Sequence, residues 1–192
     1  MSKLFWGFFF IFINFNLTFN EVYSLNVLPP FVGYLLLLAA IRELEGESSL
    51  FQGARPFAVG MAVYTALLWT GNLFGMGAGW IGGLLDLIAT AAALYVEWVI
   101  IQGILDMETC RGAELNGKAM MTIWRRMLVV QIAAQLSGLL ASVSTIGFLA
   151  LVWMVLAVFA FVNVILFLMA LWKGKKLYED LEPQADGPET AE

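Results

Sequence analysis

The sequence predicts an all-α membrane protein, a polytopic transmembrane helical bundle with six spans and both termini on the cytoplasmic side. Hydrophobic residues make up 61% of the 192 positions and the mean hydropathy is +0.83, well above the roughly 45–50% apolar content of soluble domains. The apolar residues form six stretches with short connections. One bundle over residues 1–176 accounts for these stretches, so we expect a single domain.

The N-terminal third holds two expected spans. The first begins with LFWGFFFIFINFNLTF and lacks the small-residue cleavage site of a signal peptide, so we expect it to be retained. In the second, Pro29 and Pro30 suit a helix start. Its apolar run from Val27 to Ile41 is shorter than the roughly 17–25 residues of a usual crossing, which leaves this span the weakest. The six expected spans cover about residues 4–20, 27–44, 56–74, 80–105, 125–144 and 147–172.

Four further spans follow in order. Pro56 opens the third, and a glycine-rich turn after it predicts a tight hairpin into the fourth. A polar segment over 106–118 separates the fourth span from the fifth. After the sixth, the segment 177–192 is acidic and contains Pro183 and Pro188, which predicts a disordered, solvated cytoplasmic tail.

The basic residues give the orientation. Lys and Arg concentrate in short cytoplasmic loops of membrane proteins. Six spans place all ten of them on one side, and the three opposite turns contain none. If the second span did not cross, only Lys3 would change sides. The ten are Lys3, Arg42, Arg55, Arg111, Lys118, Arg125, Arg126, Lys173, Lys175 and Lys176.

Two polar stripes lie within the expected bilayer. Asp86, Thr90 and Glu97 share one face of the fourth span, and Gln131, Gln135 and Ser142 repeat the same spacing on the fifth. An acid at the bilayer centre costs roughly 2.5–3.5 kcal/mol, so both acids need compensation. The register of an antiparallel hairpin predicts a Glu97–Arg126 charge pair. The stripes either stabilise helix packing with the carboxylates reaching the interfaces, or line a path for a proton or small cation.

Several function classes lack support. Histidine is absent, and Cys110 is the single cysteine, so we expect no metal site, disulfide or histidine-based catalysis. No nucleophile elbow or phosphate-binding loop is present, so we name no catalytic residue and expect no cofactor. The net charge of −5 arises largely in the tail, and no nucleic-acid partner is expected.

The stretch 15–55 resembles small uncharacterised membrane proteins of Firmicutes bacteria. The similarity lies in LNVLPPFVGYLLLL, followed by Leu44, Phe51 and Ala54 with Arg55. Those proteins often read Leu-Pro-Asp before Phe-x-Gly-Tyr, whereas Pro30 stands here in place of the Asp. The resemblance implies a bacterial cytoplasmic membrane and brings no activity.

Three functions are consistent with these observations. The first is a multi-pass integral membrane protein that serves as an accessory or interaction subunit, with the lipid bilayer and a protein partner or second copy of itself as partners. The alternative is a small proton or cation transporter or channel that uses Asp86 and Glu97. An intramembrane enzyme is a distant third.

Overall fold

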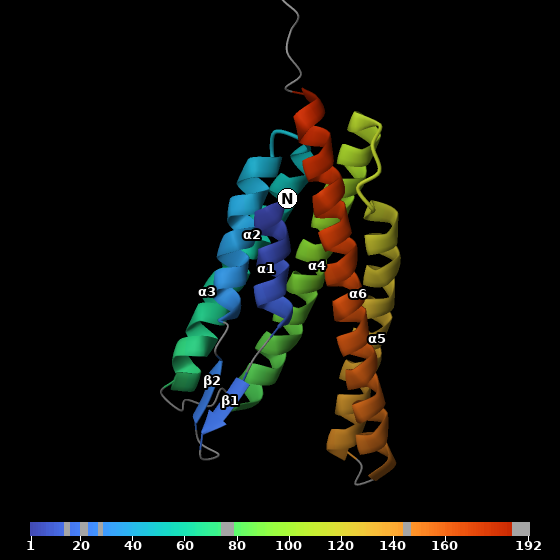
Figure 1. Ribbon diagram of the computed structural model, residues 1–192. Coiled ribbons are helices and arrows are strands. Elements are labelled where there is room, and N and C mark those ends of the chain that lie inside the picture. Colours follow the sequence, from blue (N-terminus) through green and yellow to red (C-terminus); the bar gives the residue numbers. More distant parts are fainter. Residues whose placement is uncertain (14–15, 20–22, 27–28, 74–78, 144–146, 186–192) are drawn as a thin grey trace, which may run out of the picture.

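The computed structural model describes residues 1–13, 16–19, 23–26, 29–73, 79–143 and 147–185. These residues form six α-helices, one short 3-10 helix (η1) and a two-stranded antiparallel hairpin (Figure 1). In chain order the elements are α1 (Ser2–Phe12), β1 (Asn16–Phe19), β2 (Tyr23–Asn26), α2 (Pro30–Leu44), η1 (Ser49–Ala54), α3 (Arg55–Leu73), α4 (Gly79–Arg111), α5 (Gly117–Val143) and α6 (Gly147–Ala185).

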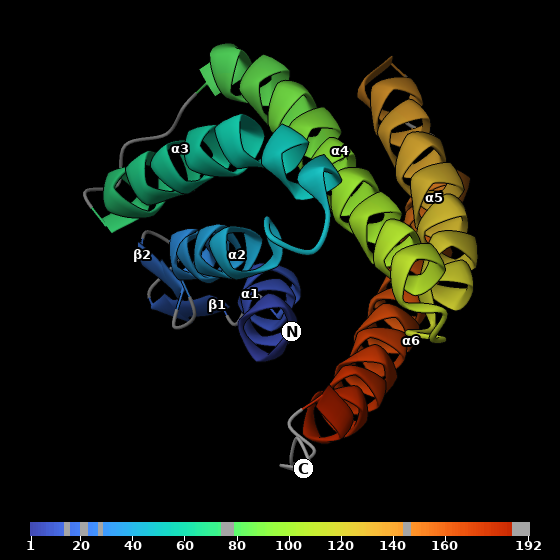
Figure 2. The ribbon, with the colours of Figure 1, turned by 90° about the horizontal axis from the view of Figure 1, so that it is seen from above.

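The helices form a closed ring in sequence order. Each helix packs on the next one along the chain, and α6 returns to pack on α1. The view along the ring shows α1, α2 and α3 on one side, α5 and α6 on the other, and α4 running between α3 and α5 (Figure 2). Within the described residues, the backbone of α4 does not approach that of α1 or α6 closely. The space between α4 on one side and α1 and α6 on the other is therefore bridged by side chains and not by direct backbone contact.

Among the described residues, two helices are long and apolar enough to cross a membrane, over Gly83–Arg111 and Leu151–Leu181. Only 28% and 22% of the residues in their most apolar windows are buried inside the protein. A core helix of a soluble protein would be mostly buried, whereas these helices leave large apolar side chains such as Leu87, Val158 and Phe161 exposed. Their outer faces thus suit an apolar solvent.

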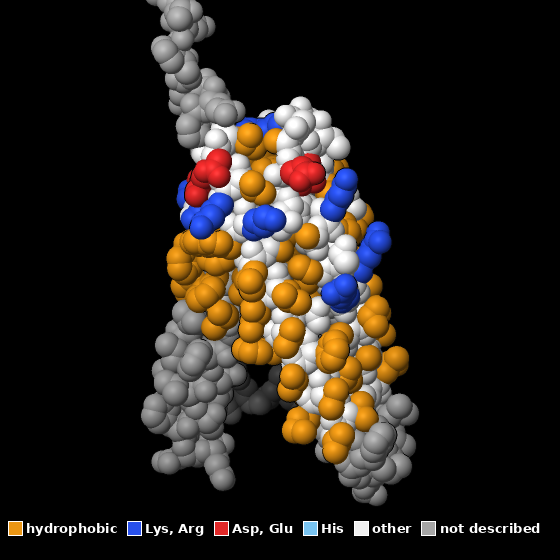
Figure 3. All heavy atoms as spheres, turned by 45° about the vertical axis from the view of Figure 1, so that its right-hand side comes forward, with side chains coloured by type: hydrophobic (Ala, Val, Ile, Leu, Met, Phe, Trp, Pro, Cys, Tyr) orange, Lys and Arg blue, Asp and Glu red, His pale blue; other side chains and the backbone are white. Residues whose placement is uncertain are grey.

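Charged side chains gather at one end of the helices (Figure 3). That end carries the start of α1, the connection from α2 to α3, the connection from α4 to α5, and the last turns of α6 (Figure 1). Lys3 pairs with Glu43 there, which joins the N-terminus to the end of α2. A second ion pair joins Arg111 of α4 to Glu47, and the Arg111 Nε donates to Glu47 Oε2 at 2.8 Å.

The first helix is shorter than the sequence predicts. A helix was expected over about 4–20, but α1 ends at Phe12 and β1 begins at Asn16. Residues 14, 15 and 20 lie outside the described part of the chain. Asn and Thr, which recur in this stretch, are poor helix formers because their side chains compete for backbone hydrogen bonds. A hairpin forms instead, with Asn16 paired to Asn26 and Phe19 to Tyr23.

The last helix is longer than predicted. α6 continues past Trp172 to Ala185, so the expected disordered tail over 177–192 is helical in its first part. The residues from 186 onward lie outside the described residues. Lys175 and Glu179 form an i, i+4 ion pair at 3.5 Å, and Tyr178 is buried beneath the Arg111 guanidinium, which lies 5.1 Å from its ring centre. These contacts hold the extension against the rest of the charged end.

α4 and α5 are also longer than their expected spans, and a short connection joins them. Gly112 adopts φ +62° directly after α4, the left-handed conformation that ends many helices. The Glu108 carboxylate then turns back and accepts hydrogen bonds from the backbone N–H groups of Leu115 and Gly117, at 2.7 and 2.8 Å. Gly117 opens α5, where backbone N–H groups have no partner within the helix, and Leu115 lies two residues before it.

Replacing Glu108 by Ala is expected to destabilise the start of α5 by about 1–2 kcal/mol, because the two N–H groups lose their acceptor. Thermal unfolding of the purified protein in detergent measures the loss. Glu114→Ala is the matched control, since Glu114 is an exposed acid in the same connection. Equal effects of the two substitutions would contradict a capping role for Glu108.

α1 and α2 pack through paired glycines. A methyl group added at Gly33 would lie 2.6 Å from the carbonyl oxygen of Gly7, and one added at Gly7 would lie 2.9 Å from Leu37. The two backbones therefore touch where they cross. α2 itself begins at Pro30, as the prolines predict.

The 3-10 helix η1 anchors the connection between α2 and α3. Phe51 is fully buried, and its ring lies over Gly103 of α4, where an added methyl group would be 2.7 Å away. Beside it, the buried Ser48 hydroxyl donates to Asp106 Oδ2 at 2.6 Å. Through these contacts, Phe51 and Ser48 connect the first three helices to α4.

Candidate functional site

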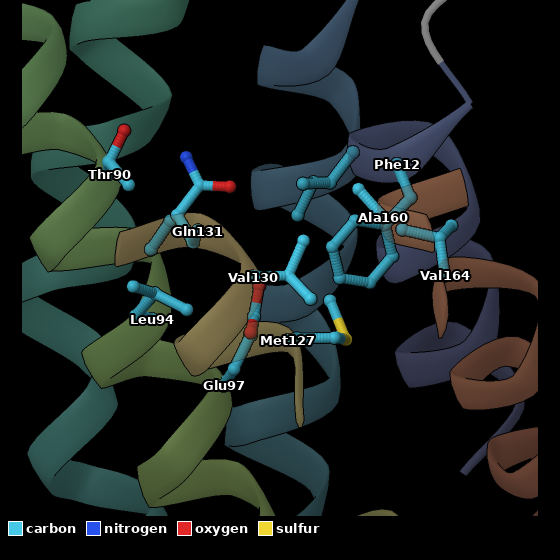
Figure 4. A pocket seen from close by; sticks show the side chains of 11 residues that line it. Phe12, Thr90, Leu94, Glu97, Met127, Val130, Gln131, Ala160 and Val164 are labelled. Carbon is cyan, nitrogen blue, oxygen red and sulfur yellow. The ribbon is translucent and has the colours of Figure 1, made fainter. Parts of the chain in front are cut away.

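A pocket of about 550 Å³ lies inside the ring, between α1, α4, α5 and α6 (Figure 4). Its size is within the range of small-molecule sites. Most of the lining residues are apolar, and one has an ionisable side chain. The lining residues are Ile11, Phe12, Thr90, Ala93, Leu94, Glu97, Met127, Val130, Gln131, Ala160 and Val164.

Glu97 is the ionisable group of this pocket. Its side chain is only 5% exposed, and its Oε2 atom has no hydrogen-bond partner among the described residues. Its carboxylate points into the pocket (Figure 4). Glu97 lies in a buried stretch of α4 between Val96 and Val99, so helix packing fixes its position. Tyr34 of α2, also buried, is close enough to interact with its charge. A buried acid without a partner is costly and is typical of functional positions.

The structure brings together part of the two predicted polar stripes. Thr90 and Glu97 of α4 and Gln131 of α5 line the same pocket (Figure 4). Gln135 is half-buried and does not belong to the lining. The side chain of Ser142 lies outside the described residues. The stripes therefore meet at the level of Glu97.

Asp86 lies in a different environment from Glu97. It is exposed, and its Oδ1 accepts a hydrogen bond of 2.8 Å from the Tyr64 hydroxyl of α3. It does not line the pocket. The expected path through both acids is therefore not continuous within the described pocket. Nothing in the sequence spacing pointed to Tyr64, because a contact between neighbouring helices depends on how each is rotated.

The expected Glu97–Arg126 pair does not form in the described structure. Glu97 is buried, whereas Arg126 is exposed and absent from the ion pairs of the described residues. The Trp124 indole donates to the Leu94 carbonyl oxygen at 3.2 Å, which sets the register of α4 against α5. Met127, the neighbour of Arg126 in the sequence, lines the pocket with Glu97, so α4 and α5 are level there as expected, and the pair does not form because the Arg126 side chain is exposed outside the pocket.

The chemistry that the pocket offers is cation or proton binding. It presents one carboxylate, one hydroxyl and one amide, with no basic side chain in its lining. No cluster of three or more acidic, His or Cys residues that could hold a metal ion occurs in the described part of the chain. The pocket also lacks a nucleophile paired with a base, so it has no catalytic arrangement to describe.

Comparison with models of protein families, with curated proteins and with solved structures finds no match to this chain.

Proposed function

We propose that this chain is a six-span protein of a bacterial cytoplasmic membrane, and that it moves a proton or small cation through the ring by way of Glu97. The observation that carries the proposal is the buried carboxylate, which faces a pocket and whose Oε2 has no hydrogen-bond partner in the described part of the chain. A carboxylate inside a membrane bundle requires either a proton or a cation. Transport would consist of binding that proton or cation at Glu97 and releasing it on the other side.

The charged end supports the cytoplasmic placement of both termini. Lys3, Arg42, Arg55 and Arg111 lie at helix ends that share this side of the ring, together with the extension of α6. The positive-inside rule assigns such an end to the cytoplasm. The exposed apolar faces of α4 and α6 then lie in lipid.

The first crossing is unusual in this proposal. With 11 residues, α1 is roughly 16 Å long, about half of a hydrocarbon core of roughly 30 Å. Strand β1 adds roughly 13 Å. We propose that helix and strand together make the first crossing, with β2 packed on α3, since non-helical backbone inside a membrane needs protein around it.

Cys110 provides a direct test of the topology. It is exposed at the end of α4 and is the single cysteine of the chain. We expect a membrane-impermeant maleimide to label it in inside-out vesicles and not in right-side-out vesicles. In a Cys110→Ser background, Ser2→Cys should follow the same pattern, and Thr70→Cys, near the opposite end of α3, should show the reverse. Labelling of Ser2→Cys from outside would reduce the count to five spans.

Transport is tested by flux through proteoliposomes. The wild-type protein is expected to dissipate an imposed proton or alkali-cation gradient, and Glu97→Gln to reduce the flux to that of protein-free liposomes, because the amide cannot carry the charge. Asp86→Asn is the matched control: it changes an acid on the same helix that lies outside the pocket, and its flux should equal wild type. Equal flux in wild type and Glu97→Gln would contradict the proposal.

A further inference from the structure

The composition of the pocket wall narrows the kind of cation it can hold. Eight of the eleven lining residues are apolar, including Phe12, Val130 and Val164, and three are polar. A proton or a small hydrated cation at Glu97 would make no contact with these apolar side chains. A ligand with an apolar body would cover the wall, and one with a positive head would meet Glu97.

Other ligand classes fit less well. A divalent metal ion requires six or more oxygen ligands and usually more than one carboxylate, whereas the lining offers Glu97 as its single acid. An anion would face that carboxylate without any basic side chain in the lining. A neutral apolar molecule would leave Glu97 without a partner.

We propose that the pocket binds an organic monoammonium ion with an apolar body, which deepens and rests on the transport function proposed above. The ammonium group donates hydrogen bonds to the Glu97 carboxylate, and Thr90 and Gln131 add polar groups elsewhere in the same pocket. The apolar body fills the space beside Phe12 and Val164.

Calorimetry on the protein in lipid nanodiscs tests this assignment, with empty nanodiscs to subtract partition into lipid. The probes are 4-phenylbutylammonium, 4-phenylbutanol and 4-phenylbutyrate, which share an apolar body and differ in the charge of the head. We expect the ammonium probe to bind wild type at least about tenfold more tightly than the alcohol, because it alone brings a positive charge to the Glu97 carboxylate. The carboxylate probe should not bind.

Two variants and their controls locate the binding. Glu97→Gln should weaken binding of the ammonium probe at least about tenfold, while Asp86→Asn should leave it unchanged. Ala160→Phe fills the pocket and should abolish binding while keeping Glu97. Ala157→Phe makes the same change at an exposed position of α6 and should bind as wild type does.

The outcomes separate this inference from the proposed function. Equal binding of the ammonium and alcohol probes, or unchanged binding in both Glu97→Gln and Ala160→Phe, would overturn the inference. Wild-type protein that conducts protons or alkali cations through Glu97 but does not bind the ammonium probe would overturn the inference and leave the proposed function standing. Absence of both binding and flux would overturn both.

Discussion

Replacing Phe51 by Ala is expected to destabilise the protein by about 3–5 kcal/mol, the usual cost of removing a fully buried aromatic side chain. The ring fills the space over Gly103 of α4, so its loss leaves a cavity between η1 and α4. Ser48 and Asp106 are hydrogen-bonded beside that cavity and would be opened to water. Thermal unfolding in detergent, followed by size-exclusion chromatography of the soluble fraction, measures the loss.

The neighbouring Leu50 supplies the control. Its side chain is 45% exposed, so Leu50→Ala is expected to change stability by less than about 0.5 kcal/mol. A Phe51→Ala protein as stable as Leu50→Ala would show that η1 does not hold the first three helices to α4. Both residues lie in η1, so the difference between the two variants reports the loss of the buried ring and not a general effect of changing this segment.

Gly33→Val is the second substitution with a large expected effect. Its Cβ would lie 2.6 Å from the Gly7 carbonyl oxygen and 2.7 Å from the Ile11 side chain, so α1 and α2 would have to move apart. Overpacking of this kind costs about 1–3 kcal/mol, and here the atom in the way is backbone. Displacement of α1 would also move Ile11 and Phe12 out of the pocket wall.

Gly60→Val is the matched substitution on α3. Nothing lies within 4 Å of a methyl group added at Gly60, and valine has the same low helix propensity at both positions. The difference in melting temperature between the two variants therefore reports the crossing of α1 and α2. Equal melting temperatures of Gly33→Val and Gly60→Val would contradict the close approach of α1 and α2.

Much of the fold can be predicted from hydropathy, prolines and charge. The start of α2 at Pro30 follows from the proline pair, and the helix pattern from Arg55 onward follows from the apolar runs between short connections. The gathering of Lys3 and Arg111 at one end follows from counting basic residues. Prolines and apolar runs are local signals, and the end at which a basic residue lies depends only on how many helices precede it.

Other features depend on packing that a pattern does not determine. α1 ends at Phe12 because strand pairing of 16–19 with 23–26 competes with the helix, and the outcome depends on which hydrogen bonds form. The lengths of α5 and α6 depend on the Glu108 cap and on the contact of Tyr178 with Arg111. Each of these contacts joins separate segments of the chain, and a hydropathy pattern contains no information on such contacts.

The candidate site shows the same division. Spacing placed Thr90 and Glu97 on one face of α4 and Gln131 on the corresponding face of α5, and these three side chains share the pocket. The same spacing also included Asp86, but α4 extends beyond the pocket and Asp86 meets Tyr64 instead. The contribution of α1 and α6 to the wall could not be found from polar residues, because those helices supply only apolar side chains there.

The return of α6 to α1 has a consequence for biosynthesis. Phe8 and Phe12 of α1 pack edge-to-face on Phe167 of α6, at ring-centre distances of 5.3 and 5.7 Å. In the proposed membrane protein the N-terminal helices would be inserted first, so α1 would lack this partner until α6 has been synthesised. Until then the Glu97 carboxylate lies on an open wall. The proposed binding at Glu97 would therefore require all six helices, and a ligand bound there would favour the fully assembled state.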